Sequence, residues 1–392
     1  MNVETPVYLD YAATTPVEPA VAEAMAATLL PGGSFGNPSS NHPLGREALT
    51  IVETARQQLA ALIGARPRDL IWTSGATESD NMAITGGARY RQHRGKHLIT
   101  MPVEHKAVTD TFAALEREGF EVTWLSPSND GMLDLQQLAD AIREDTQLVS
   151  IMFVNNETGV IQDIEAIGKR CRDSDILFHV DAAQAVGKVP IDLSELPVDL
   201  MSLTAHKFYG PKGVGALYIA DRPGCQIEPI LFGGGHERRM RPGTSAVHQL
   251  RGIGLAAEIA ASRIEEDFVH IRSLRERLWA GIRDLPALSI NGPAGGGFPG
   301  ILNVSAEGVD GESLMLALDP VCVASGSACN AKSGEASYVL RALGLDDHLA
   351  QSAIRFSIGR HSIAADIDIA IECYRHAVTM LREMAPVARK CV

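Results

Sequence analysis

The chain has 392 residues, of which 45% are hydrophobic, and its formal net charge is −13 at pH 7. This length and apolar content favour two domains, and the acidic charge argues against a direct nucleic-acid partner. No apolar run reaches the roughly 18 residues that span a bilayer, and the N-terminus has no signal-peptide pattern. We therefore expect a cytoplasmic enzyme with a small-molecule substrate and no membrane contact.

From about residue 45 to 220, helical and apolar patterns alternate. The segment "ALTIVETARQQLAALIG" has helical spacing and ends at Gly64, which is typical of a helix stop. Short apolar runs follow, bounded by turn residues: "DLIWTSG", "KHLITMP", "EVTWLSP", "QLVSIMFV" and "ILFHVDAAQ". Apolar strands alternating with helices predict a mainly parallel sheet covered on both faces. Such sheets bind ligands at the carboxyl ends of their strands.

Polar or small residues follow the first two of these strands. After "DLIWT", the small residues Ser74, Gly75 and Ala76 precede a helix that we expect to start near Thr77. A helix start of this kind can bind an anion, although an ordinary turn would look the same. His105 follows "KHLITMP"; a lone histidine is more often structural, but its position at a strand end makes it a candidate.

The next two strands also end in polar residues. Asn155 and Asn156 follow "VSIMFV", where they form a turn or offer amide groups to a ligand. Asp181 and Gln184 follow "ILFHV". A carboxylate at this point could hold a protonated ring nitrogen, or it could cap the next helix.

The segment "VDLMSLTAHKFYGPKGVGALYI" contains Lys207, preceded by Thr204 and His206. A lysine between two apolar strands is a candidate Schiff-base lysine, although most lysines lie on the surface. The strand-end residues together match one ligand, with a phosphate, a pyridine nitrogen near Asp181 and an aldehyde carbon at Lys207. That ligand is pyridoxal phosphate. The segment "HERRM" is no zinc motif, because Met240 replaces the second histidine.

After about residue 262 the pattern changes to a charged helix and shorter elements, which predicts a smaller α+β domain. Its segment "VCVASGSACNAKSGEAS" contains two cysteines. Cys322 is flanked by valines, and we expect it to be packed in the core. Cys329 lies among Gly, Ser, Ala, Asn and Lys, which is compatible with a reactive thiol on a loop or with a small buried residue. The six cysteines have spacings that fit neither a disulfide framework nor a zinc site, and we expect no metal.

A series of motifs resembles the NifS/IscS-type cysteine desulfurases of the class-V aminotransferase family. They include "YLDYAATTP", "TSGATESDN", "EHKAV", "VNNETG", "HVDAAQ", "HKFYGPKGVGALY", "GGGHERRMRPGT", "SGSAC" and "IRFSIGR". The resemblance implies the α/β fold-type I architecture of pyridoxal-phosphate enzymes, with a mainly parallel seven-stranded sheet, and a homodimer. The large domain would comprise residues 16–262. Residues 1–15 and 263–392 would form the small domain, with a mobile cysteine loop at about 325–337.

The resemblance also implies a role for each candidate residue. Lys207 would hold the cofactor covalently, Asp181 would pair with the pyridine nitrogen, and His105 would stack on the ring and assist proton transfer. The remaining cofactor contacts would be Gln184 at the phenolic oxygen and, at the phosphate, Ala76, Thr77, Thr204, His206 and the other subunit's Thr244. Arg355 would clamp the carboxylate of the substrate L-cysteine, with Asn156 helping. Cys329 would accept the substrate sulfur as a persulfide, and L-alanine would be released.

Two features leave the final sulfur acceptor open. The motif "SGSAC" is that of the long-loop branch of the family, but "NAKSGEAS" departs from the loop of the housekeeping iron–sulfur members. The C-terminal tail, which ends in "LREMAPVARKCV", also resembles a shorter version of theirs. The acceptor protein would be an iron–sulfur scaffold or a dedicated partner in tRNA thiolation or DNA phosphorothioate modification. The role of Cys391, near the end of the chain, is open as well.

Two alternatives to a cysteine desulfurase are considered. A selenocysteine lyase or another class-V aminotransferase-fold enzyme would not need a thiol at position 329. A pseudo-enzyme that serves as a binding scaffold is disfavoured, because Lys207, Asp181, His105, Arg355 and Cys329 are all present.

Overall fold

The computed structural model describes residues 6–293, 295–325 and 336–384. Its largest sheet has seven strands in the order β2-β8-β7-β6-β5-β3-β4. The strands are β2 (Leu70–Thr73), β3 (His97–Thr100), β4 (Glu121–Trp124), β5 (Thr146–Ser150), β6 (Leu177–Asp181), β7 (Leu200–Thr204) and β8 (Gly215–Ile219). β8 runs antiparallel to both of its neighbours, and the other six strands of this sheet share one direction. The predicted mainly parallel, seven-stranded sheet is therefore confirmed.

The larger body also contains six helices within the described residues, four of which, α3 to α6, connect strands of the sheet. They are α2 (Pro43–Leu62), α3 (Ala76–Arg91), α4 (Lys106–Arg117), α5 (Leu135–Ala141) and α6 (Ile164–Asp173), with α1 (Pro19–Leu29) nearer the N-terminus. The residues of β2, β3, β5, β6 and β7 are all buried, as expected for strands covered on both faces. The first predicted helix corresponds to α2, and Gly64 follows it with φ +64°, a backbone conformation that favours glycine.

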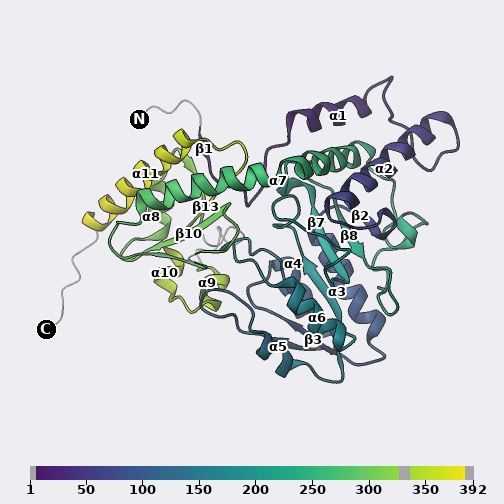
Figure 1. Ribbon diagram of the computed structural model, residues 1–392, viewed down its shortest axis with the longest axis horizontal. Helices are drawn as coiled ribbons and strands as arrows, with labels where there is room; N and C mark the ends of the chain where they lie inside the picture. Colours follow the sequence, from purple (N-terminus) through teal and green to yellow (C-terminus); the bar gives the residue numbers. More distant parts are fainter. Residues whose placement is uncertain (1–5, 294, 326–335, 385–392) are drawn as a thin grey trace.

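The remaining elements form a smaller body with a hydrophobic core of its own, next to the larger body that contains the seven-stranded sheet (Figure 1). An antiparallel sheet has the order β12-β13-β10-β9. Its strands are β9 (Leu288–Ile290), β10 (Ile301–Ala306), β12 (Ala324–Ser325) and β13 (Ala353–Ser357). The helices packed here are α8 (Gly311–Ala317), α9 (Tyr338–Ala342), α10 (Asp347–Gln351) and α11 (Ala364–Met384). Near the N-terminus, β1 (Val7–Tyr8) pairs in parallel with β11 (Val321–Cys322).

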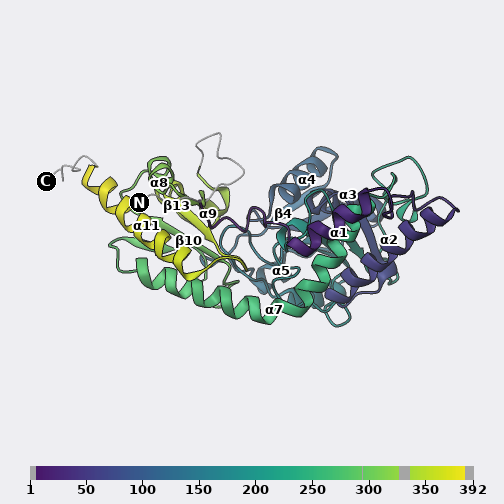
Figure 2. The same cartoon turned by 90° about the horizontal axis from the view of Figure 1, so that it is seen from above.

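One long helix, α7 (Val247–Ile282), runs alongside both bodies (Figures 1 and 2). Its first half contributes Val247 and Ala260 to the larger core, and its second half contributes Ile271 and Ile282 to the smaller one. The helix continues without a break through position 262, where the sequence pattern suggested a boundary. The domain limits given above stay a prediction.

The expectation for Cys322 was wrong. The structure describes this side chain as exposed, whereas Val321 beside it is buried. Neighbouring side chains on a strand point to opposite faces, so only one of the two can face the core. Val321 belongs to the core of the smaller body, so the Cys322 side chain faces away from it.

Among the helices of the described residues, none has the length and apolar content that a membrane span requires.

Candidate active site

A cavity of about 590 Å³ opens at the carboxyl ends of the central strands. This volume is in the range of pockets that bind small ligands, roughly 300–1,000 Å³. The predicted residues that line it are Ala76, Thr77, His105, Asn156, Asp181, Gln184, Thr204, His206, Lys207 and Arg355. Thr244 is exposed and does not line this cavity. Cys329, like Cys391, lies outside the described residues.

One end of the cavity is the start of α3. Gly75 is the N-cap, with φ +154°, and it has no side chain to satisfy the N–H groups of the first turn. Ala76 and Thr77 follow and line the cavity. A Cβ atom on Gly215 of the adjacent β8 would lie 2.7 Å from the Gly75 Cα, so the backbones approach too closely for any other residue. A helix N-terminus in this position attracts an anion.

The same end of the cavity carries a histidine and several lysines. The Nδ1 atom of His206 lies 3.2 Å from the Thr14 hydroxyl oxygen. Burial, with the charges of Lys207, Lys212 and Lys188, lowers the pKa of His206 to about 4. His206 is therefore neutral near pH 7. A bound phosphate would add a negative charge among these cations and raise that pKa.

Asp181 ends β6, and its Oδ1 atom accepts a hydrogen bond of 2.9 Å from the Ala183 N–H. Burial raises the pKa of this carboxyl, whereas His105 and Lys207 act in the opposite direction. A carboxyl that burial disfavours as an anion becomes ionised when a cation lies against it. His105 is the N-cap of α4, where its Nδ1 atom accepts from the Ala107 N–H at 3.1 Å. This bond fixes the imidazole at the cavity wall.

Lys207 lies in a 3₁₀ turn directly after β7. Its Nζ atom donates to the carbonyl oxygens of Ala12 and, at 2.7 Å, Ala13. Gln184 donates from Nε2 to the same Ala12 oxygen at 2.8 Å. The N-terminal segment, which resembles the family motif "YLDYAATTP", therefore closes the cavity over the two residues. The sequence alone indicated no role for this segment beyond its resemblance to the family.

Arg355, on β13, brings the smaller body to the same cavity. Its guanidinium donates at 2.8 Å to the Asn156 carbonyl and at 2.8 Å to Asp10 Oδ1. Two atoms here, Arg355 Nε and Asn156 Oδ1, are buried without a hydrogen-bond partner among the described residues. Unpaired buried polar groups cost free energy unless a ligand or water binds them, so this corner points to a polar ligand. Sequence reasoning missed Asp10, which lies 345 positions from Arg355.

Glu157, the neighbour of Asn156, was also missed. Its Oε2 atom accepts a hydrogen bond of 2.5 Å from the Ser337 hydroxyl at the start of α9. Burial raises the pKa of Glu157 to about 7. The hydrogen bond from Ser337 and the charge of Arg355 lower this pKa, but they offset the effect of burial only in part. The sequence offered one indication of a role for Glu157, which is its position directly after Asn155 and Asn156 at a strand end.

We predict that Glu157→Gln changes how stability depends on pH. The folded chain holds the Glu157 proton up to about pH 7, whereas the unfolded chain releases it near the ordinary glutamate pKa of 4.5. The contribution of this group to stability is thus fully present below pH 4.5 and is lost as pH rises through about 7. Glutamine cannot ionise, so the stability of the Glu157→Gln variant does not fall with rising pH on account of this residue. Between these limits, the unfolding free energy of the variant should rise relative to wild type by about 3 kcal/mol.

Denaturant unfolding at a series of pH values measures this difference. The matched control is Glu265→Gln, on an exposed position of α7, which should follow the wild-type curve. A difference between Glu157→Gln and wild type that stays constant over this pH range would contradict the prediction.

Comparison with known proteins identifies the family. The class-V aminotransferase family model matches residues 7–369. The chain belongs to the class-V aminotransferases. The cysteine desulfurase IscS of Klebsiella pneumoniae is 54% identical over 385 residues, which is 98% of this chain and 95% of that protein. The chain is thus a cysteine desulfurase of the NifS/IscS type.

Two solved structures share the architecture of this class-V aminotransferase. A NifS-like protein superposes with a TM-score of 0.89 and 36% identity, over 96% of this chain and all of that one. A structure described as SspA in complex with cysteine has a TM-score of 0.78 and 36% identity, over 91% of this chain and 99% of that one. These likenesses confirm the fold-type I architecture expected from the sequence.

Class-V aminotransferases of this kind depend on pyridoxal phosphate, and the cavity fits that cofactor. The open helix start among lysines suits the phosphate, and the buried Asp181 suits a protonated pyridine nitrogen. The Lys207 amine lies in the same cavity, where an aldehyde can reach it. The unpaired Asn156 and Arg355 atoms lie where an amino-acid carboxylate needs partners.

Proposed function

We propose that this cavity removes the sulfur of L-cysteine, releases L-alanine and leaves the sulfur on Cys329 as a persulfide. The observation that carries the proposal is a single cavity lined by an amine, a buried carboxyl and a guanidinium, those of Lys207, Asp181 and Arg355. The amine and the carboxyl suit a pyridine aldehyde, and the guanidinium suits an amino-acid carboxylate. The cysteine desulfurases among the relatives support the choice of amino acid.

The residues around the cofactor have separate tasks in this proposal. Lys207 holds the cofactor covalently and, once the substrate has displaced it, takes the Cα proton at Nζ. Asp181 stays ionised against the pyridine nitrogen, and His105 packs on the ring and assists proton transfer. The phosphate is held by Ala76, Thr77, Thr204 and His206. When bound, pyridoxal phosphate acts as an electron sink for the substrate.

Arg355 binds the substrate carboxylate in this proposal, with Asn156 beside it. We predict that Arg355→Ala raises the KM for L-cysteine by about 10- to 100-fold, because a charge-assisted hydrogen-bond pair is lost. Steady-state kinetics with L-cysteine measure the effect. Cysteamine, which has no carboxylate, is the matched control substrate, and the variant should use it no worse than wild type. An unaltered dependence on cysteine concentration would mean that the carboxylate binds elsewhere.

The sulfur step uses Cys329 as a thiolate. The thiolate attacks the substrate sulfur, a new S–S bond forms, and the Cβ–S bond breaks. The electron pair of that bond stays with the carbon skeleton, which takes up a proton and leaves as alanine. A hydroxyl could not replace the thiol at this step, because it ionises at a much higher pH.

We also propose a homodimer. Thr244 is exposed and away from the cavity of its own chain, which supports its predicted role at the phosphate of the other subunit. Large apolar side chains are exposed on the same body, among them Phe35 and, with 86% of its surface accessible, Phe232. Apolar side chains exposed to this extent are typical of an interface between subunits. Sedimentation of the purified chain tests the assembly.

The acceptor of the persulfide sulfur is proposed to be an iron–sulfur scaffold protein in the cytoplasm. The 54% identity to cysteine desulfurase IscS over 98% of the chain supports this choice over a tRNA-thiolation or DNA-phosphorothioation partner. Radiolabelled sulfur from cysteine should then appear on a purified scaffold. Formation of one alanine per cysteine by the purified chain tests the reaction itself.

A further inference from the structure

A second lysine stands directly behind the cofactor residues. The Nζ atom of Lys188 lies 2.6 Å from the Oε1 atom of Gln184 and donates to it. The residue is partly buried, four positions after Gln184 in the turn that follows β6. Lys188 does not line the cofactor cavity, but Gln184 does, so the hydrogen bond to Gln184 connects the Lys188 amine to that cavity.

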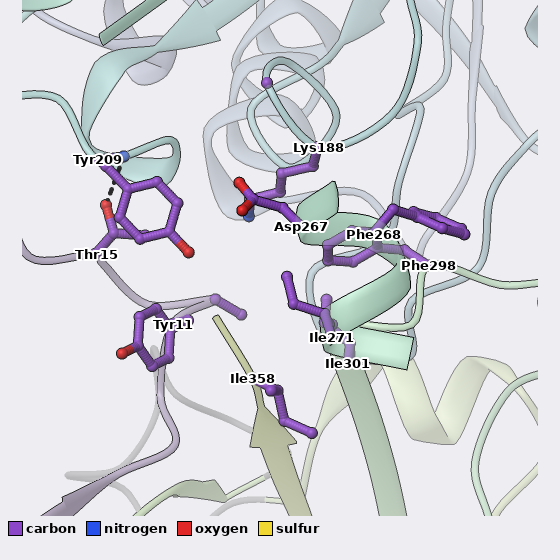
Figure 3. Close-up of a pocket in the computed structure, with 13 residues that line it drawn as sticks. Tyr11, Thr15, Lys188, Tyr209, Asp267, Phe268, Ile271, Phe298, Ile301 and Ile358 are labelled. Atoms are coloured by element: carbon purple, nitrogen blue, oxygen red, sulfur yellow. Dashed lines mark hydrogen bonds between the residues drawn. The ribbon is translucent and has the colours of Figure 1, made fainter. Parts of the chain in front are cut away.

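The surroundings of Lys188 explain why its amine turns toward Gln184. It lines a small cavity of about 20 Å³, together with Tyr11, Asp267 and Phe298 (Figure 3). The Asp267 carboxylate is already bonded to Arg360, at 2.8 Å. The ring centroid of Phe298 lies 5.6 Å from the amine.

The charged groups that act on Lys188 are those of the active site. Burial lowers the pKa of its amine well below the usual value, and the charges of Lys207 and Arg355 lower it further. Asp267 on α7 is the acidic residue on the lining of the small cavity.

Two hydrogen bonds determine the orientation of the Gln184 amide. The Ala12 carbonyl can only accept, so the amide nitrogen must face it. The amide oxygen then faces Lys188, which donates whether or not it is protonated. The nitrogen has a second N–H, and Gln184 lines the cofactor cavity. Without Lys188, the buried oxygen would lose its partner and the amide could rotate.

We propose that Lys188 is a positioning residue for the cofactor, which holds the Gln184 amide so that one N–H points to the phenolic oxygen of pyridoxal phosphate. This inference rests on the proposed function, in which Gln184 contacts that oxygen. An N–H donor stabilises the oxygen as an anion and so lowers the pH at which the bound cofactor changes its absorption. Lys188 sets that pH through Gln184.

The test is a spectroscopic pH titration of the purified holoenzyme. In Lys188→Met, which keeps the chain length but has no donor, the midpoint of the cofactor absorption change should rise by about one unit. The same rise is expected for Gln184→Met, and the double variant should show no more than either single one. Lys188→Gln, which keeps an N–H donor, should stay close to wild type. Lys169→Met, at an exposed position of α6, is the matched control and should not shift the midpoint.

The outcomes separate this inference from the proposed function. A wild-type protein without a cofactor absorption band would overturn the proposed function. A normal wild-type titration with an unshifted midpoint in Lys188→Met would overturn the positioning role, even if thermal stability falls. Additive shifts in the double variant would also overturn it, since Lys188 would then act independently of Gln184. If Lys188→Met does not fold, Lys188→Leu carries the same expectation.

Discussion

Replacing Lys207 with alanine is expected to abolish turnover, with alanine formation from L-cysteine reduced by at least about 10³-fold. The variant loses both the covalent attachment point of the cofactor and the base for the Cα proton. The Lys207 amine donates to the backbone carbonyls of Ala12 and Ala13, and water in the open cavity can hydrogen-bond these carbonyls after the change. We therefore expect the variant to fold and to bind the cofactor without a covalent bond.

Two measurements check this expectation. Quantified alanine after incubation with cysteine gives the loss of turnover, and gel filtration in a denaturant after borohydride reduction of the imine shows whether the cofactor is covalently attached. The matched control is Lys212→Ala, an exposed lysine on the same cavity. It should weaken cofactor binding without removing the reaction. Alanine formation at the wild-type rate by Lys207→Ala would refute the assignment of Lys207.

The large sheet could be predicted because parallel strands buried on both faces are continuous apolar runs. β2, β3 and β6 coincide with such runs. The strand ends indicated where to look for the site, because a polar residue soon after a buried parallel strand lies at the carboxyl edge of the sheet. His105, Asp181 and Lys207 could thus be selected one by one, and the parallel topology brings them together.

Contacts between distant segments were beyond local patterns. The pairing of Asp10 with Arg355 depends on the β-bridge between Asp10 and Ser357 of β13, which no periodicity of the sequence indicates. The exposure of Cys322 depends on which face of β11 packs on the smaller core, and Val321 occupies that face. Lys188 gave a weak signal, as one lysine within the apolar segment "AAQAVGKVPI", but its bond to Gln184 required the turn geometry.

Cys329→Ser is expected to reduce alanine formation from L-cysteine by at least about 10²-fold, because a hydroxyl is not ionised near neutral pH and is a poor acceptor of sulfur. The other cysteines of the larger body cannot substitute for it. Burial raises the pKa of Cys225 to about 12 and that of Cys171 further, so both remain thiols. The cofactor spectrum should be unchanged, since the residues proposed to hold the cofactor are intact.

The matched control is Cys322→Ser, because Cys322 is the exposed cysteine within the described residues. It should retain wild-type activity and still form one persulfide per chain, measured by mass spectrometry of the protein after incubation with cysteine. Loss of both persulfide and alanine in Cys329→Ser alone identifies Cys329 as the sulfur acceptor. Release of sulfide or selenide at the full rate by Cys329→Ser would instead favour a selenocysteine lyase, in which no enzyme thiol takes part in breaking the carbon–chalcogen bond.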